Sequence, residues 1–270
     1  MSKILKNTLF QLSKPILQKS SKFYNIHKGE SCYIFGDGIS IKFFDLKNFT
    51  DKIGIACNYI PFHNDFNYLN AQYCVNSAPY FFSPYFGYKD TVFKKYLFET
   101  SKIYKEIVTK NPQKTFFFNL SNYPFISGNN VHFNFKKYIA DNLPNNFISN
   151  RISCFDGVLR NSVSLAIYLG FENIYLIGCD YTFSPSQHYH WYESGEGLIK
   201  SIDNYQTDFF NIAAEFADIT TITLNGKSDL LSYISYESFT GKKLEYKENI
   251  NIISDRYLQT LKKWPGFKIL

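Results

Sequence analysis

The residues best suited to chemistry lie in one short stretch, Cys179 to Tyr192. The stretch contains two histidines, His188 and His190, and His188 could take a proton from a substrate hydroxyl, because an unperturbed imidazole is largely neutral at cytoplasmic pH. The same stretch carries tyrosine hydroxyls, which can donate hydrogen bonds to phosphate oxygens without a metal. These are Tyr181, Tyr189 and Tyr192. These residue types make the stretch the first candidate for an active site.

Two other interpretations of the histidines stay open. Both could be ordinary loop residues that take no part in chemistry. Alternatively, the spacing His188-x-His190 with Asp180 nearby could bind a divalent ion, since imidazole and carboxylate groups are common metal ligands.

The elements before this stretch would position it. Residues 157–170 predict an amphipathic helix that is closed by a glycine, with an apolar stripe formed by Val158, Leu159, Val163, Ala166 and Leu169. Residues 173–178 are a short apolar run, typical of a strand buried on both faces of a parallel sheet. Ligands of open α/β sheets collect beyond the carboxyl ends of strands, so any active site should include the residues after this strand.

A second candidate feature is a turn near the start of the domain. Residues 31–35 predict a strand that runs directly into Gly36-Asp37-Gly38-Ile39-Ser40. Glycines permit a tight turn whose backbone N–H groups can cradle a phosphate. The third glycine of a dinucleotide fingerprint is missing, and no acidic residue ends a clear second strand, so an NAD-type site is disfavoured.

Two asparagines follow two further predicted strands. Residues 52–56 lead to Asn58, and residues 72–75 lead to Asn76. Asparagine is a routine turn former after a strand, which would make either residue purely structural. Two of them beyond successive strands favour a polar rim that hydrogen-bonds a ligand.

The rest of the chain alternates helical and strand patterns. Helices are predicted at 91–109, 135–143, 201–217, 229–236 and 254–263, and strands at 115–120 and 220–224. This alternation predicts an α/β, Rossmann-like fold with a mainly parallel sheet flanked by helices. A chain of 270 residues can bury a full core in one large domain with a small lid.

The composition narrows the setting. Five cysteines, an odd number without C-x-x-C spacing, indicate neither a disulfide framework nor a zinc site and suit a reducing cytoplasm. No apolar run approaches the roughly 18 residues of a membrane span, and the N-terminus lacks a secretory signal. We therefore expect a soluble protein or one peripheral to a membrane.

The basic charge is concentrated in residues 1–28. Six lysines there precede the first acidic residue, Glu30, and equal the net charge of +6. With the interleaved apolar residues they could form an interfacial helix on an anionic membrane, broken near Pro15. The alternative is a helix that packs on its own domain or on a partner chain, and both interpretations also suit residues 256–270.

Several motifs, in consistent order from residue 31 to residue 192, resemble one group of proteins. They are YIFGDGISI, IACNYI, YCVNSAPYFF, FFFNLSNY and AIYLGFENIYLIGCDY with a following HY. They are similar to the bacterial sialyltransferases of glycosyltransferase family 42. They also resemble the related group of motility accessory factors and 6-hydroxymethylpterin pyrophosphokinase-like proteins.

The resemblance implies an inverting, metal-independent transfer of a nonulosonic acid, such as sialic acid, from a CMP-sugar donor to a cell-surface glycan or glycolipid. Such enzymes serve lipopolysaccharide or capsule biosynthesis. No cofactor besides the donor and no nucleic-acid partner is expected, and a homo-oligomer is compatible with the sequence. We expect a cytoplasmic protein at the inner face of the membrane, with a basic arm (1–28) and a single domain (29–270) that has a lid near 184–200.

The resemblance also assigns residues. Gly36, Asp37, Gly38 and Ser40 match the turn that contacts the nucleotide, Asn58 and Asn76 match donor-binding asparagines, and Asp156 and Gly157 match the turn before the central helix. Asp180 and Tyr181 match the strand end near the cytidine and phosphate, and His188 matches the catalytic base. We group Tyr181 and Tyr189 with His188 as catalytic residues, and His190 and Tyr192 with the substrate-binding residues.

The chain departs from the family at the turn, where the usual Gly-Asn-Gly-Pro-Ser has Asp37 at its second position. A carboxylate beside a phosphate is unfavourable unless it meets a ribose hydroxyl or a cation. The segment before His188 is also short, so the lid could lie in residues 193–199, with Gly195 and Gly197 as hinges.

Two other functions stay open. In a Mg-dependent pterin pyrophosphokinase, Asp37 and Asp180 would serve as cation ligands. The third candidate is a non-catalytic accessory protein that binds a nucleotide or glycan.

Overall fold

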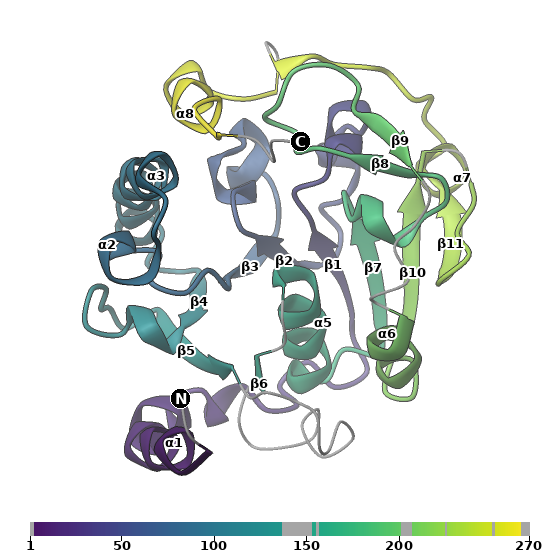
Figure 1. Cartoon of the computed structure of the whole chain (residues 1–270). Helices are drawn as coiled ribbons and strands as arrows, with labels where there is room; N and C mark the ends of the chain where they lie inside the picture. Colours follow the sequence, from purple (N-terminus) through teal and green to yellow (C-terminus); the bar gives the residue numbers. More distant parts are fainter. Residues whose placement is uncertain are drawn as a thin grey trace.

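A parallel β-sheet forms the centre of the structure, a computed structural model that describes residues 3–136, 153–154, 157–200, 207–224, 226–249 and 252–265. Its nine strands have the order β11-β10-β7-β1-β2-β3-β4-β5-β6, and neighbouring strands are parallel (Figure 1). The strands are β1 (Ser31–Phe35), β2 (Ile53–Cys57), β3 (Ala71–Asn76), β4 (Thr115–Asn119), β5 (Val131–Lys136), β6 (Ser153–Cys154), β7 (Asn173–Ile177), β10 (Asp218–Thr223) and β11 (Ser232–Ser235). The predicted α/β fold class with a parallel sheet is confirmed.

Helices cover both faces of this sheet. The described α-helices are α1 (Lys3–Gln18), α2 (Pro84–Gly87), α3 (Thr91–Lys110), α5 (Val158–Leu169), α6 (Thr207–Ala213), α7 (Tyr236–Thr240) and α8 (Asp255–Leu261). Side chains of β1 alternate between two cores, as the pleat of a strand requires. Cys32 and Ile34 pack with α5 and α6, which lie in front of the sheet in Figure 1, whereas Tyr33 and Phe35 belong to the core of α3 and α8.

The strand order reverses at β1. From β1 the chain builds the sheet outward through β2 to β6, and then returns to add β7 on the other side of β1. Such a reversal leaves a crevice beyond the carboxyl ends of the two strands, where open α/β sheets bind their ligands. Here those ends lead into the turn Gly36–Ser40 and into Gly178–Asp180.

Most predicted elements correspond to observed ones. The predicted strands at 31–35, 52–56, 72–75, 115–120, 173–178 and 220–224 are β1, β2, β3, β4, β7 and β10. The predicted helices at 91–109, 157–170 and 254–263 are α3, α5 and α8, and α6 covers part of 201–217.

Two predicted helices are wrong in part. Residues 232–235 form β11, which pairs with β10 through register partners such as Tyr233 and Thr221, and a helix begins only at Tyr236. In the predicted helix 135–143, Phe135 continues β5 and pairs with Ser153. Residues 137–143, like 201–206, lie outside the described residues.

The N-terminal helix α1 packs on the domain by its C-terminal half. It contacts β5, and Leu17 is buried in the core. The predicted break at Pro15 is wrong, because α1 continues through this residue. Pro15 is exposed, so water can satisfy the carbonyl group that loses its helical donor. Within the described part of the chain, no helix has the length and apolar character needed to span a membrane.

Candidate functional site

The turn after β1 holds a buried carboxylate. The Ser40 amide donates a hydrogen bond to Asp180 Oδ2 over 2.8 Å, and the Ser40 hydroxyl donates to Asp180 Oδ1. Asp180 and Ser40 are both fully buried. The amides of Gly36 and Gly38 also have partners, the carbonyl oxygens of Ile177 (2.7 Å) and Gly178 (2.8 Å). The carboxylate of Asp180 thus takes hydrogen bonds that a phosphate could otherwise accept from Ser40, and contact of this turn with a nucleotide stays a prediction.

Asp37 is the second buried carboxylate of the turn. Its Oδ1 accepts hydrogen bonds from the Tyr59 amide and from Trp191 Nε1, each over 3.3 Å. Burial raises the pKa of Asp37 to about 6, although the nearby His190 and these hydrogen bonds oppose the shift. Burial likewise raises the pKa of Asp180 to about 7 against the hydrogen bonds from Ser40. The site thus holds two carboxylates whose charged forms are costly.

Of the two predicted asparagines, one bonds its own turn and the other lies beside the buried carboxylates. Asn76 Oδ1 accepts a hydrogen bond from the Ala78 amide over 3.0 Å, so it caps its own turn, as the structural interpretation expected. Asn58 has a positive φ of 38° and its side chain bonds Asp37, which places it next to the carboxylate pair.

The turn before α5 is only partly described. Gly157 is exposed and has a φ of 86°, a left-handed value that favours glycine. Its carbonyl oxygen accepts a hydrogen bond from Asn161 Nδ2 over 3.0 Å. Asp156, the other predicted residue of this turn, lies outside the described residues.

The histidine segment after β7 folds back onto the glycine turn. His190 and Gly38 form an antiparallel bridge, and the Trp191 amide donates to the Asp37 carbonyl oxygen over 3.1 Å. His190 Nδ1 lies 2.6 Å from Glu193 Oε1, which also accepts from the His190 amide over 2.9 Å. The structure therefore brings His190, Asp37, Gly38 and Asp180 together at the strand-order reversal.

The other predicted residues of this segment differ in exposure. His188 lies in β8 (Ser186–His188), with its ring edge-on to Tyr181 at a centroid distance of 4.9 Å, and Tyr181 is 40% exposed. Tyr189 has a positive φ of 91°. Tyr192 is only 1% exposed and packs against Tyr59, and its contact with a substrate stays a prediction.

The alternative of a three-ligand metal site is not supported. Among the residues that the structure describes, no three His, Cys, Asp or Glu side chains gather as metal ligands. His188, His190 and Asp180 therefore do not form the divalent-ion site that their spacing allowed.

The predicted lid, residues 184–200, is an antiparallel hairpin. His188 in β8 pairs with Leu198 in β9 (Leu198–Lys200). The proposed hinges Gly195 and Gly197 have φ values of 82° and 90°, a region that favours glycine. That this segment opens and closes stays a prediction.

A buried lysine that the sequence analysis missed fixes this segment. The Lys42 side chain is fully buried, and its ammonium donates to the carbonyl oxygens of Glu193 and of Gly195, the latter over 2.8 Å. It also pairs with Glu248 Oε1 at 3.1 Å. Burial lowers the pKa of Lys42, and the ion pair opposes that shift. The only sequence signal was one lysine inside the apolar run after the turn, which by itself does not identify its partners.

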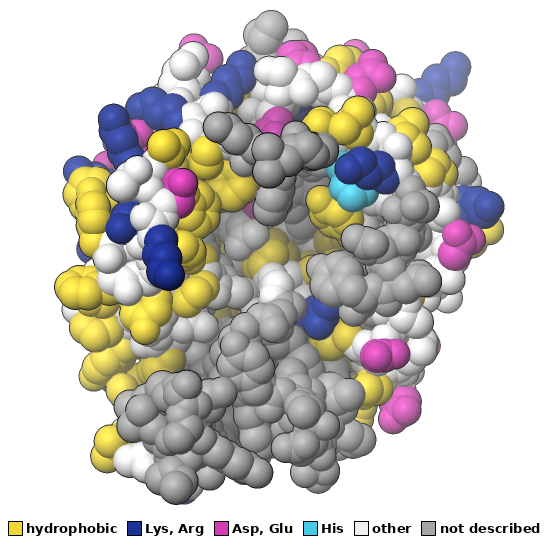
Figure 2. Space-filling view, in the orientation of Figure 1, with side chains coloured by type: hydrophobic (Ala, Val, Ile, Leu, Met, Phe, Trp, Pro, Cys, Tyr) yellow, Lys and Arg dark blue, Asp and Glu magenta, His cyan; other side chains and the backbone are white. Residues whose placement is uncertain are grey.

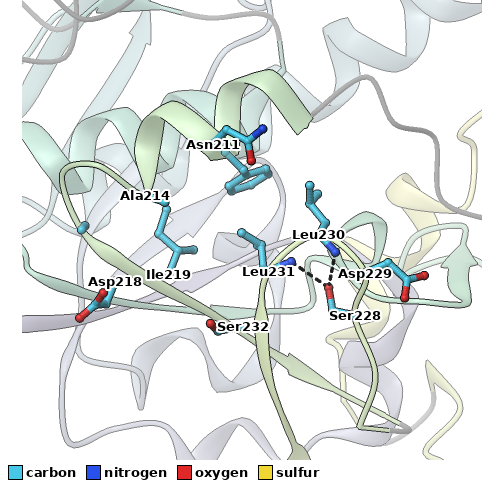
Figure 3. A pocket seen from close by; sticks show the side chains of 11 residues that line it. Asn211, Ala214, Asp218, Ile219, Ser228, Asp229, Leu230, Leu231 and Ser232 are labelled. Carbon is cyan, nitrogen blue, oxygen red and sulfur yellow. Dashed lines mark hydrogen bonds between the residues drawn. The ribbon is translucent and has the colours of Figure 1, made fainter.

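Two other cavities lie away from this site. One, of about 380 Å³, lies at the amino ends of β10 and β11, opposite the edge that carries Asp180, with Asp218, Ile219 and Leu231 in its wall (Figure 3). The other, of about 640 Å³, lies on α2 and α3. Figure 2 shows apolar and basic side chains side by side over these two helices.

The sequence matches no known protein-family profile and no curated protein. Among solved structures the chain is similar to the MAf glycosyltransferase from Magnetospirillum magneticum AMB-1, with 12% identity and a TM-score of 0.44. That match covers 92% of this chain and 40% of the MAf chain, so this chain spans less than half the length of that enzyme.

Two further structures come from Campylobacter jejuni. The sialyltransferase CstII, in complex with the substrate analogue CMP-3FNeuAc, is 15% identical with a TM-score of 0.41, over 87% of this chain and 99% of that one. An alpha-2,3-sialyltransferase in apo form is 16% identical with a TM-score of 0.42, over 82% and 86% of the two chains. All three are glycosyltransferases. They are the kinds of enzyme that the sequence motifs resemble.

Proposed function

We propose that this chain is a glycosyltransferase that moves a nonulosonic acid from a CMP-sugar donor to a glycan acceptor, with inversion and with a histidine as general base. The observation that carries the proposal is the contact between the histidine segment and the turn after β1. The Gly38–His190 bridge puts an imidazole and its carboxylate partner at the edge where an open α/β sheet binds its ligand.

The residues there meet the chemical needs of such a transfer. The acceptor hydroxyl must lose a proton, which a neutral imidazole can take. The departing CMP phosphate needs hydrogen-bond donors, and Tyr181 is exposed enough to serve as one. Aromatic rings around the histidine segment, among them Tyr192 and Trp264, exclude water from the oxocarbenium-like centre.

A Mg-dependent pyrophosphokinase suits the described residues less well. Such an enzyme needs carboxylate oxygens free to bind the cation. Asp180 uses both oxygens for Ser40, and Asp37 accepts from Tyr59 and Trp191. The two carboxylates therefore support the turn instead of presenting open ligands.

A nucleotide panel read by thermal shift tests the proposal. We expect CMP and CDP to raise the melting temperature in the presence of EDTA, because binding to the folded state alone adds RT ln(1 + [L]/Kd) to the free energy of unfolding. At a ligand concentration of about 100 times Kd the gain is about 2.7 kcal/mol. Stabilisation by ATP only with Mg would favour the kinase, and stabilisation by no nucleotide would favour an accessory protein.

We also propose that the acceptor is lipid-linked, as in lipopolysaccharide or capsule biosynthesis, and that the basic arm holds the enzyme at the inner face of the membrane. The six lysines of residues 1–28 support this, since a lysine near an anionic surface contributes about 1 kcal/mol. Removing the arm is a poor test, because Leu17 and Phe23 belong to the core.

The test is therefore a full-length variant with these six lysines changed to glutamine. We expect it to pellet with anionic liposomes at least tenfold more weakly than the parent chain at low salt. The difference should vanish at about 1 M salt, where the Debye length falls to about 3 Å. Lys242→Gln with Lys243→Gln serves as the control, since both lysines are exposed and outside the arm. Equal pelleting of the arm variant and the parent would exclude the arm as the membrane contact.

A further inference from the structure

The two histidines of the site segment have different surroundings. Nε2 of His188 is buried and reaches no solvent, and its ring packs against Tyr181. The His190 side chain is 27% exposed and is bridged through its backbone to Gly38. A base must reach a proton on a bound substrate, and of these two residues it is His190 that is bridged to the turn after β1.

A carboxylate orients the His190 ring. Partial burial acts to raise the pKa of Glu193, but the hydrogen bonds from His190 outweigh it and hold that pKa below its usual value. Glu193 is therefore ionised at neutral pH and accepts a hydrogen bond from Nδ1 over 2.6 Å. With Nδ1 as the donor, Nε2 of the neutral ring carries the lone pair. In the described part of the chain, Nε2 has no hydrogen-bond partner.

Packing fixes the plane of the ring. His190 stacks on Tyr192, with centroids 5.0 Å apart and an interplanar angle of 6°, and Trp264 meets it edge-on at 5.8 Å. These two rings restrict rotation of the His190 side chain. Because the ring cannot turn, the contact of Nδ1 with Glu193 also fixes the direction in which Nε2 points.

The backbone that carries this carboxylate is held in place by side chains from two other segments. Lys42 donates to the backbone carbonyl oxygen of Glu193, and Asn249 Nδ2 donates to the same oxygen over 3.2 Å and to that of Tyr192 over 3.1 Å. Glu248 pairs with Lys42 and accepts from the Gly195 amide over 3.3 Å. Segments far apart in the chain thus converge to fix one glutamate.

We propose that His190, not His188, is the general base of the transfer, and that Glu193 is the positioning residue that leaves Nε2 as its proton acceptor. The proposal rests on the proposed function. Nε2 takes the proton of the acceptor hydroxyl while its oxygen bonds to the anomeric carbon of the sugar. The bond from that carbon to the CMP phosphate oxygen breaks, and CMP leaves with the electron pair. The imidazolium, neutralised by Glu193, later releases its proton to water.

Carboxylates from different segments of the chain face His190. Glu193 lies on its own segment, Asp37 follows β1, and Asp180 follows β7; these are the anionic groups around it. Lys42 is the cation of this cluster, and its charge helps to lower the pKa of Glu193. Removal of the Glu193 charge should therefore weaken the hold on the Nδ1 proton, because Glu193 is the group in contact with that nitrogen.

The test measures CMP release from CMP-N-acetylneuraminic acid, with water as the acceptor, together with CMP binding by calorimetry. His190→Ala should lower turnover by about 10²- to 10⁴-fold with CMP affinity unchanged. Glu193→Gln should lower it by about 10- to 10³-fold, and Glu193→Asp should recover part of the rate. Glu196→Gln, an exposed residue of the same loop, is the matched control.

Nitrogen NMR of the histidine rings gives a readout that needs no activity. We expect His190 to carry its proton on Nδ1 at neutral pH in the parent and to lose this preference in Glu193→Gln. A proton on Nε2 in the parent, or a larger rate loss in His188→Ala than in His190→Ala, would overturn the assignment. Absence of any CMP or CMP-sugar binding would instead refute the proposed function, while the NMR result still tests the His190–Glu193 pair.

Discussion

Gly38→Ala is expected to destabilise the fold by about 3 kcal/mol and to abolish the stabilisation by CMP. A Cβ atom at this position would lie 2.4 Å from Cγ of Asp180 and 2.6 Å from the carbonyl oxygen of Gly178. Real Cβ atoms essentially never approach other atoms so closely, and Asp180 cannot retreat because Ser40 holds both of its oxygens. The backbone of Gly38 has a φ of −66°, which any residue can adopt, so the requirement for glycine is one of space.

The measurement is chemical denaturation of the parent and variant, followed by calorimetry with CMP. Gly241→Ala is the control, because its φ is 69° but nothing lies within 4 Å of an added Cβ. That variant should lose only about 1 kcal/mol. If Gly38→Ala were as stable as this control and bound CMP normally, the close packing of the turn against Asp180 would be refuted.

Asp180→Asn should stabilise the protein at pH 8 and have little effect at pH 4. Burial raises the pKa of Asp180 from 3.8 to about 7, so the folded protein holds this proton more tightly than the unfolded chain does. Stability is therefore full below the unfolded pKa and is lost as pH rises through the folded pKa. Three pKa units correspond to about 4 kcal/mol, which asparagine avoids because it does not ionise.

Guanidinium unfolding at the two pH values checks this prediction. The free energy gained by Asp180→Asn should be about 4 kcal/mol at pH 8 and less than about 1 kcal/mol at pH 4. Asp218→Asn is the control, since Asp218 is exposed at the opposite edge of the sheet and should respond at neither pH. A destabilised Asp180→Asn variant at pH 8 would mean that Asp180 is stabilised as an anion by its surroundings.

The sheet was predictable from sequence because its central strands are short apolar runs between turn residues. The strands β1, β2, β3, β4 and β7 all have this form, and burial on both faces is what such runs require. The edge strand β11 was not predicted. Its residues Ser232 and Tyr233 are exposed, and β11 is a strand only because it pairs with β10. Local pattern carries no information about pairing of that kind.

The sequence indicated which strand ends would carry the candidate site, but it did not indicate which side chains would contact one another there. The residues after β1 and β7 were identified from the rule that ligands collect at strand ends. The pairing of Asp180 with Ser40 and of His190 with Glu193 was not, because it depends on how the segment after β7 folds back onto the turn. Lys42 is the clearest case of a contact that the sequence does not reveal, because its partners Glu193 and Glu248 lie far from it along the chain.

The dependence of this lysine on Glu248 has a consequence for synthesis on the ribosome. A nascent chain grows from its N-terminus, so one that has emerged only to residue 200 contains His190 and Glu193 but not Glu248 or Asn249. Without these two partners, the Lys42 ammonium has lost its counter-charge and the backbone around Glu193 has lost a donor. The nascent chain should therefore orient the His190 imidazole only after Glu248 and Asn249 have been made, and products truncated before them should lack the proposed activity.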